Sequence, residues 1–320
     1  MRAAGAPKLG HALTAAFTLL ELLVAAAISV VIMAVLVFML SRVMSGWDRT
    51  QGRLAAETQA LHVLELLTLD LQGASGPDGP GIWLAATIQG ADGASGTWVG
   101  GVKPEEGSLR PEAEPFRIAR FGRAGMWLRC ITTRRGGEVR SAEPTAPVAV
   151  AYQLIRRAPT AGGTQGRYLL YRSEATASAT FAAGYDLSAA AYTNASDASG
   201  SAGSLVSPPL RALLAEDVVD FGVRFGRAAQ VPGEDGATLI PLFPKAGGPL
   251  DYAVDGDEGV TAPHAPRPNV ADVLVRMLSP EGARRIAALE SGQITGDWWQ
   301  IAEAESYVFT RRILLPLGGR

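Results

Sequence analysis

The fold of this chain is decided by one stretch, FTLLELLVAAAISVVIMAVLVFML, residues 17–40. From Leu22 to Leu40 every residue is apolar except Ser29. As a helix the stretch reaches about 36 Å, which exceeds the roughly 30 Å hydrocarbon core of a membrane. It is also longer than the apolar part of a cleaved secretory signal. We therefore expect it to span a membrane and to remain as an anchor.

The flanks of this stretch predict its orientation. The short arm before it carries Arg2, Lys8 and His11 and no acidic residue, whereas a long polar chain follows it. Basic residues in short loops favour the cytoplasmic side, although Arg42 lies just beyond the stretch. We expect a single-pass protein with a cytoplasmic N-terminus and a head outside the membrane.

Glu21 is the one ionisable residue in the stretch. A charge at the centre of a spanning helix costs on the order of 2.5–3.5 kcal/mol by insertion scales. Such a residue indicates a functional site with a partner. The alternative is a glutamate that lies at the membrane interface, close to the helix start.

The run Ala16-Phe17-Thr18-Leu19-Leu20-Glu21-Leu22-Leu23 resembles the class III leader and N-terminal helix of type IV prepilins and type II secretion pseudopilins. In that family the prepilin peptidase cuts before the Phe and the new N-terminus is methylated. The resemblance implies cleavage between Ala16 and Phe17 and N-methylation of Phe17. It also implies that Glu21 serves subunit assembly by attracting the α-amino group of a neighbouring subunit. Ala16 departs from the Gly that is usual in the family.

Beyond the spanning stretch the sequence predicts one long helix and a β-rich head. Apolar residues recur at helical spacing up to Leu71, and Gly73 ends the pattern. A short helix is predicted at 281–290, and strand patterns occur at 116–121, 126–133, 148–156, 168–172, 218–225, 270–278 and 307–317. We expect an α+β fold in which a long N-terminal helix packs on a C-terminal antiparallel β-sheet head with long loop insertions, and the resemblance to pilins implies the same architecture.

The predicted organisation has four parts, which are a leader (1–16), a transmembrane half of the helix (17–40), its amphipathic half (41–72) and a head (73–320). Residues 73–114 are expected to form loops with one weak hairpin at most. Low-complexity insertions are placed at 174–204, expected to be a flexible loop, and at 226–268.

Parts of the head resemble the larger J-type (W-type in pili) minor pseudopilins, and also the pilin-like Verru_Chthon cassette proteins. The runs of the head that carry this weaker resemblance are 217–225, 273–276 and 309–313. The helix adds a pattern similar to that of the Verru_Chthon cassette proteins, here Trp47 followed by Asp70-Leu71-Gln72-Gly73-Ala74.

Composition and motifs exclude several classes of function. The formal net charge of −2 does not favour nucleic acid as a partner. The single cysteine, Cys130, lies in an apolar strand pattern and is expected to be a buried structural thiol. The sequence contains no nucleophile motif, no phosphate-binding loop and no pair of histidines at ligand spacing. We expect the protein not to be an enzyme.

Two weaker candidate sites lie in the head. Asp251, Asp255, Asp257 and Glu258 carry oxygen donors that suit Ca²⁺, but a solvated acidic turn is the competing interpretation. The pair Trp298-Trp299 suits either an exposed contact with a partner or the core. No other cofactor is indicated.

These observations predict a minor pilin-like subunit of a type II secretion or type IV pilus-like filament. Its bulky head suits a tip or initiating position better than the shaft. The resemblance implies as partners other pilin subunits, the prepilin peptidase and an assembly platform in the bacterial inner membrane. The alternatives are an uncleaved, membrane-anchored binding protein outside the cytoplasm and, disfavoured by the absent motifs, an anchored hydrolase.

Overall fold

The computed structural model describes residues 18–76, 81–89, 98–104, 109–133, 146–193, 200–230, 237–256 and 266–316. The leader, with Ala16, and also Phe17, Asp257 and Glu258, lie outside the described residues. The chain divides into two compact units, Met1–Gln51 and Gly52–Arg320, which we describe one at a time.

The first unit is the start of helix α1, Leu19–Gln72. Its residues Leu19–Met44 form a helical stretch that is long and apolar enough to cross a membrane, with a mean hydropathy of 3.0. All side chains of this stretch are exposed. The hydroxyls of Ser29 and Ser41 donate to the carbonyls of Ala25 and Val37, each at 2.8 Å. The serines therefore bring no unpaired polar group into the apolar stretch.

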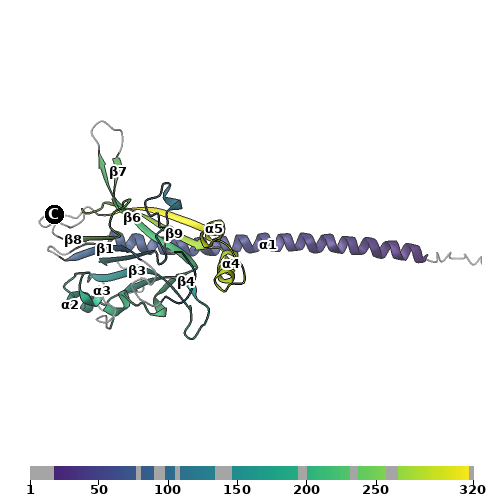
Figure 1. The fold of residues 1–320 in the computed structure, drawn as a ribbon, viewed down its shortest axis with the longest axis horizontal. Coiled ribbons are helices and arrows are strands. Elements are labelled where there is room, and N and C mark those ends of the chain that lie inside the picture. Colours follow the sequence, from purple (N-terminus) through teal and green to yellow (C-terminus); the bar gives the residue numbers. More distant parts are fainter. Residues whose placement is uncertain are drawn as a thin grey trace, which may run out of the picture. The chain divides into compact units, whose positions relative to one another are not determined.

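The second unit holds the end of α1 and two antiparallel sheets (Figure 1). The larger sheet has the strand order β5-β4-β3-β2-β1-β8, and the smaller has the order β10-β9-β6-β7. The strands are β1 (Ile82–Ile88), β2 (Met126–Thr132), β3 (Val148–Arg157), β4 (Arg167–Glu174), β5 (Leu213–Glu216), β6 (Val218–Gln230), β7 (Ala237–Phe243), β8 (Asp251–Asp255), β9 (Val270–Leu278) and β10 (Ser306–Leu314).

Short helices fill the links between strands. The α-helices are α2 (Ala177–Ala182), α3 (Ala190–Thr193), α4 (Pro280–Glu290) and α5 (Trp298–Ala304), and the 3₁₀ helices are η1 (Phe116–Ile118), η2 (Ala202–Leu205) and η3 (Leu210–Ala212). Helix α4 begins where Ser279 caps the amide of Gly282 at 2.9 Å and Pro280 takes the first helical position. The sequence predicted this helix to within one residue.

The α+β class is confirmed, as are the end of α1 at Gln72 and most predicted strands. The strand predicted at 116–121 is wrong, because the chain forms η1 there, directly after Pro115. Proline has no amide hydrogen to donate to a ladder. An isolated bridge between Arg110 and Arg120 closes this segment into a loop.

Three segments predicted as loops carry regular structure. Strand β1 lies inside 73–114 and pairs with β2 on one side and β8 on the other. The stretch 226–268 holds the end of β6 and strands β7 and β8, and β6 and β7 form a long hairpin (Figure 1). Within 174–204 the described residues form α2, α3 and η2, so the expectation of a flexible loop is wrong for them. The Thr180 hydroxyl accepts from the amide of Ala149 at 3.1 Å, which ties α2 to β3.

One hydrophobic core joins the end of α1 to both sheets. The buried face of the helix carries residues at helical spacing, which are Ala56, Ala60, Val63, Leu64, Leu67 and Leu71. On the opposite face Leu54 and Leu61 stay 58% and 48% exposed. Cys130 is fully buried in the same core, as the sequence predicts.

A buried ion pair fixes α1 against the larger sheet. Asp70, in the last turn of the helix, is fully buried. Its carboxylate accepts from Arg172 Nε at 2.8 Å and Nη2 at 3.0 Å, and from the Tyr152 hydroxyl at 2.5 Å. Arg172 lies on β4 and Tyr152 on β3. Two adjacent strands therefore hold the end of the helix.

We predict that Asp70→Asn lowers the free energy of unfolding by about 3–5 kcal/mol, because it removes the buried carboxylate that binds Arg172 through two nitrogens and leaves that guanidinium only Glu174, at 3.3 Å. Chemical denaturation of the detergent-solubilised chain, followed by tryptophan fluorescence, measures this change. The matched control is Glu281→Gln, which breaks an exposed pair with Arg284 and should cost less than about 1 kcal/mol. Equal effects of the two variants would contradict the structural role of Asp70.

Candidate functional site

Glu21 lies in the first turn of α1 and forms a reciprocal cap with Thr18. The Thr18 hydroxyl accepts from the amide of Glu21 at 3.2 Å. In return the Glu21 Oε2 atom accepts from the Thr18 amide and hydroxyl, each at 3.0 Å. Thr18 is thus the N-cap and Glu21 the third helical residue, the arrangement known as a capping box.

The role of Thr18 is a finding that the sequence analysis missed. The signal was present, because a threonine followed three residues later by a glutamate at the start of an apolar run predicts such a cap. The cap satisfies amide hydrogens that no helical carbonyl can reach. It also means that Glu21 has bonded partners within its own chain. The proposed cleavage and methylation positions, Ala16 and Phe17, lie outside the described residues.

Trp298 and Trp299 belong to the core. They are 2% and 3% exposed, so the exposed-contact interpretation is wrong and its alternative is confirmed. Asp297 caps the helix that carries them by accepting from the amide of Gln300 at 2.6 Å. The two rings pack edge to face with centroids 5.0 Å apart. Because α5 turns both indoles inward, they add packing area rather than a surface patch.

A buried lysine lies against this tryptophan pair. Lys103 is 2% exposed, and its ammonium lies 5.5 Å from the Trp298 ring and 5.1 Å from the Trp299 ring. The same group donates to the carbonyl of Val219 at 2.5 Å. Burial lowers the pKa of Lys103 from 10.5 to about 8, and the charge of fully buried Asp220 opposes this shift. Lys103 therefore connects the segment 98–104 to β6 through Val219 and to α5 through the two tryptophans.

We predict that Lys103 makes stability depend on pH. Between about pH 8 and 10.5 the unfolded chain holds more protons on this amine than the folded chain, so the free energy of unfolding rises with pH in this window. The contribution is up to about 3 kcal/mol. Lys103→Met should remove this rise, whereas Lys245→Met, at an exposed lysine, should keep it. Denaturation midpoints measured from pH 7 to 10 give the comparison, and parallel pH profiles of all three proteins would refute the assignment.

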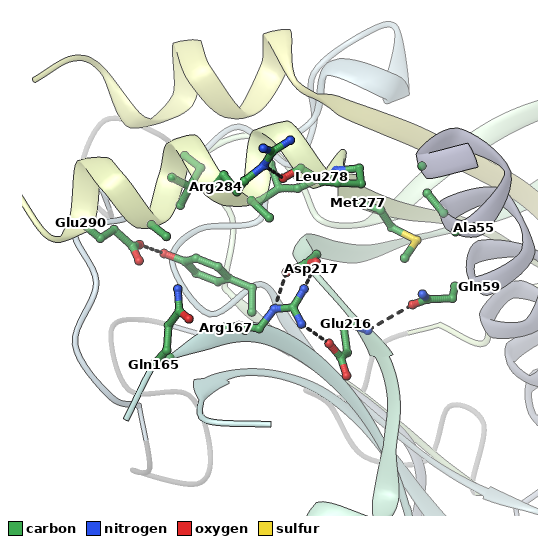
Figure 2. Close-up of a pocket in the computed structure, with 18 residues that line it drawn as sticks. Ala55, Gln59, Gln165, Arg167, Glu216, Asp217, Met277, Leu278, Arg284 and Glu290 are labelled. Carbon is green, nitrogen blue, oxygen red and sulfur yellow. Dashed lines mark hydrogen bonds and ion pairs between the residues drawn. The ribbon is translucent and has the colours of Figure 1, made fainter. Parts of the chain in front are cut away.

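A groove of about 450 Å³ lies between α1, α4 and the start of β4 (Figure 2). Figure 2 shows Arg167 between Glu216 and Asp217, with which it forms two ion pairs. Gln59 accepts from the amide of Glu216 at 3.2 Å, and Glu290 accepts from the Tyr168 hydroxyl. At Gly52 an added Cβ would lie 2.7 Å from the Pro280 ring, so α1 and α4 are in close contact there.

The charges of this groove are largely paired, and its lining includes no histidine, cysteine or serine among the described residues. Asp217 has a left-handed backbone with φ of 57°. Burial raises the pKa of its carboxyl, and the bonds from Arg167 oppose this. The Asp217 carbonyl accepts from the amide of Leu278 at 2.9 Å, so the turn joins β9 as well. These contacts stabilise packing and offer no nucleophile with an adjacent base.

Two of the four proposed calcium ligands, Asp251 and Asp255, lie within the described residues, and they do not converge. Asp251 and Asp255 are the first and last residues of β8, and a strand of this length places them about 13 Å apart. Asp251 is exposed and Asp255 is buried. One ion cannot reach both carboxylates at the 2.3–2.6 Å typical of Ca²⁺. No group of three potential metal ligands occurs among the residues that the structure describes.

Comparison with protein-family models, with curated proteins and with solved structures finds no match to this chain.

Proposed function

We propose that this chain is a minor pilin-like subunit, a pseudopilin, of a type II secretion or type IV pilus-like filament. The proposal places its N-terminus in the cytoplasm, α1 through the bacterial inner membrane and the head outside the cytoplasm. The observation that carries it is a single carboxylate, Glu21, at the start of an apolar helix whose side chains are exposed from Leu19 to Met44. In this proposal the carboxylate meets the α-amino group of a neighbouring subunit, freed by cleavage before Phe17.

The outer face of α1 in the head supports packing between subunits. Leu54 and Leu61 lie seven residues apart, so they occupy one side of the helix, and both are about half exposed. Exposed leucines at this spacing are typical of a seam between helices. The helices of other subunits are the partners that such a seam would meet in a filament.

The additions to the head support a tip or initiating position. The head carries additions to its two sheets, which are helices α2 and α3 and the β6–β7 hairpin. In a repeating shaft these additions would have to fit between every pair of stacked subunits. A subunit at the end of a filament meets fewer neighbours, and its head can be bulky.

Intact mass of the protein extracted from its native membrane tests the proposal. We predict loss of residues 1–16 and the addition of one methyl group. Retention of Met1 through Ala16 would overturn the proposal. It would favour an uncleaved anchored binding protein, for which the Thr18–Glu21 cap already supplies partners to the carboxylate within one chain.

The charge of Glu21 and its capping role can be separated by two variants. Glutamine at this position can still accept from the Thr18 amide, so Glu21→Gln keeps part of the cap and loses the charge. Thr18→Ala loses the capping hydroxyl and keeps the charge, at a cost of about 0.5–2 kcal/mol to the helix start. We predict that Glu21→Gln inserts normally but that its assembly falls roughly 3- to 30-fold. This range corresponds to the loss of about 0.6–2 kcal/mol, the energy of one polar contact between helices in a membrane.

Co-isolation of the tagged protein with other leader-bearing subunits measures assembly, and carbonate extraction measures insertion. Thr18→Ala should assemble close to the wild-type level. Normal assembly of Glu21→Gln, with a defect confined to Thr18→Ala, would show that the carboxylate serves only its own helix.

A further inference from the structure

A second pocket, of about 630 Å³, lies in the head against α1, η1, β9 and β10. It has a mixed lining with an excess of positive charge. The charged residues of the lining are Arg53, Arg110, Arg117, Arg276, Glu57 and Glu303. Because the whole chain has a net charge of −2, this basic character is local to the pocket.

The acidic residues leave part of this positive charge unpaired. Glu303 accepts from Arg110 at 3.0 Å and from Arg120 at 2.7 Å, both through Oε1. The side chains of Arg53 and Arg117 form no ion pair or hydrogen bond with any residue that the structure describes. Two guanidinium groups at the pocket are therefore free to bind a ligand.

The fourth arginine of the lining, Arg276 on β9, is only 3% exposed. Its Nη2 atom donates to the carbonyl of Arg117 at 3.1 Å, while its Nε atom is buried without a partner among the described residues. Burial lowers the pKa of Arg276, and Asp220 and Glu303 only partly oppose this. A buried cation of this kind gains from an added negative charge nearby.

The chemistry of the lining indicates the class of ligand. Guanidinium groups bind carboxylate and phosphate through paired, directional hydrogen bonds. Tyr307 and Phe309 of β10 add an aromatic side to the pocket, which suits the organic part of a ligand. We propose that this pocket binds a small oxyanion with at least two carboxylate or phosphate groups. This inference does not depend on the proposed function.

Isothermal titration of the full chain in neutral detergent, at fixed ionic strength, tests the proposal with citrate and with pyrophosphate as probes. We expect saturable binding of at least one of them at one site per chain. Arg53→Gln and Arg117→Gln should each weaken it about tenfold or more, the effect of one lost charged hydrogen bond. The control Arg211→Gln removes the same charge at an exposed position in η3 and should leave affinity unchanged.

Thermal unfolding without ligand should be the same for all these variants, because the three substituted side chains have no bonded partner among the described residues. Binding of citrate alone assigns the pocket to carboxylates, and binding of pyrophosphate alone assigns it to phosphates. The proposal is overturned if neither probe binds saturably. It is equally overturned if Arg211→Gln weakens binding as much as Arg53→Gln and Arg117→Gln do.

Discussion

The head depends on the buried contact between Asp70 and Arg172. A carboxylate in the last turn of a helix lies at the negative end of the helix dipole, and full burial adds the cost of lost hydration. The contact is tolerated because Arg172 binds it through two nitrogens and Tyr152 adds a hydroxyl. It fixes which side of α1 faces the sheet. The same constraint leaves Leu54 and Leu61 on the exposed side.

Buried polar contacts take the place of covalent cross-links in this head. With one cysteine, the chain cannot form an intrachain disulfide. Asp70 and Arg172 are 102 residues apart in sequence, and the nearly buried pair Arg156–Glu290 joins residues 134 apart. Such pairs add less net stability than apolar packing would. They disfavour alternative packings of these segments, because each alternative would leave a buried charge without its partner. They therefore specify how distant segments meet.

The parts of the fold that the sequence predicted are those with strong periodicity. Helix α1 and strands β2, β3 and β9 have continuous or alternating apolar patterns, and their bounds were close to the observed ones. Strands β1 and β8 were missed because they are short segments among glycine, proline and alanine. Their order comes from pairing, since β1 pairs with β2 on one side and with β8 on the other. The helices of 174–193 were missed for a similar reason. Their alanines and serines give little hydrophobic signal, and order there depends on contacts such as that of Thr180 with β3.

The candidate sites show the same limit. Sequence could mark Glu21 as unusual, since one acid in an apolar run stands out without any knowledge of contacts. It could not decide whether Trp298 and Trp299 face outward, because that depends on the direction of α5 and on Lys103, almost two hundred residues away. The arginines of the basic pocket are similarly dispersed, from Arg53 on α1 to Arg276 on β9.

The cap at the start of α1 leaves room for the bond between subunits that we propose. Both bonds from Thr18 end on the same oxygen of Glu21, Oε2. A carboxylate offers about four lone-pair sites over its two oxygens. The Oε1 atom, which accepts no bond from the described residues, can therefore meet a second donor while the cap stays formed. Because the cap fixes the direction of the carboxylate before a partner arrives, less side-chain entropy is lost on pairing.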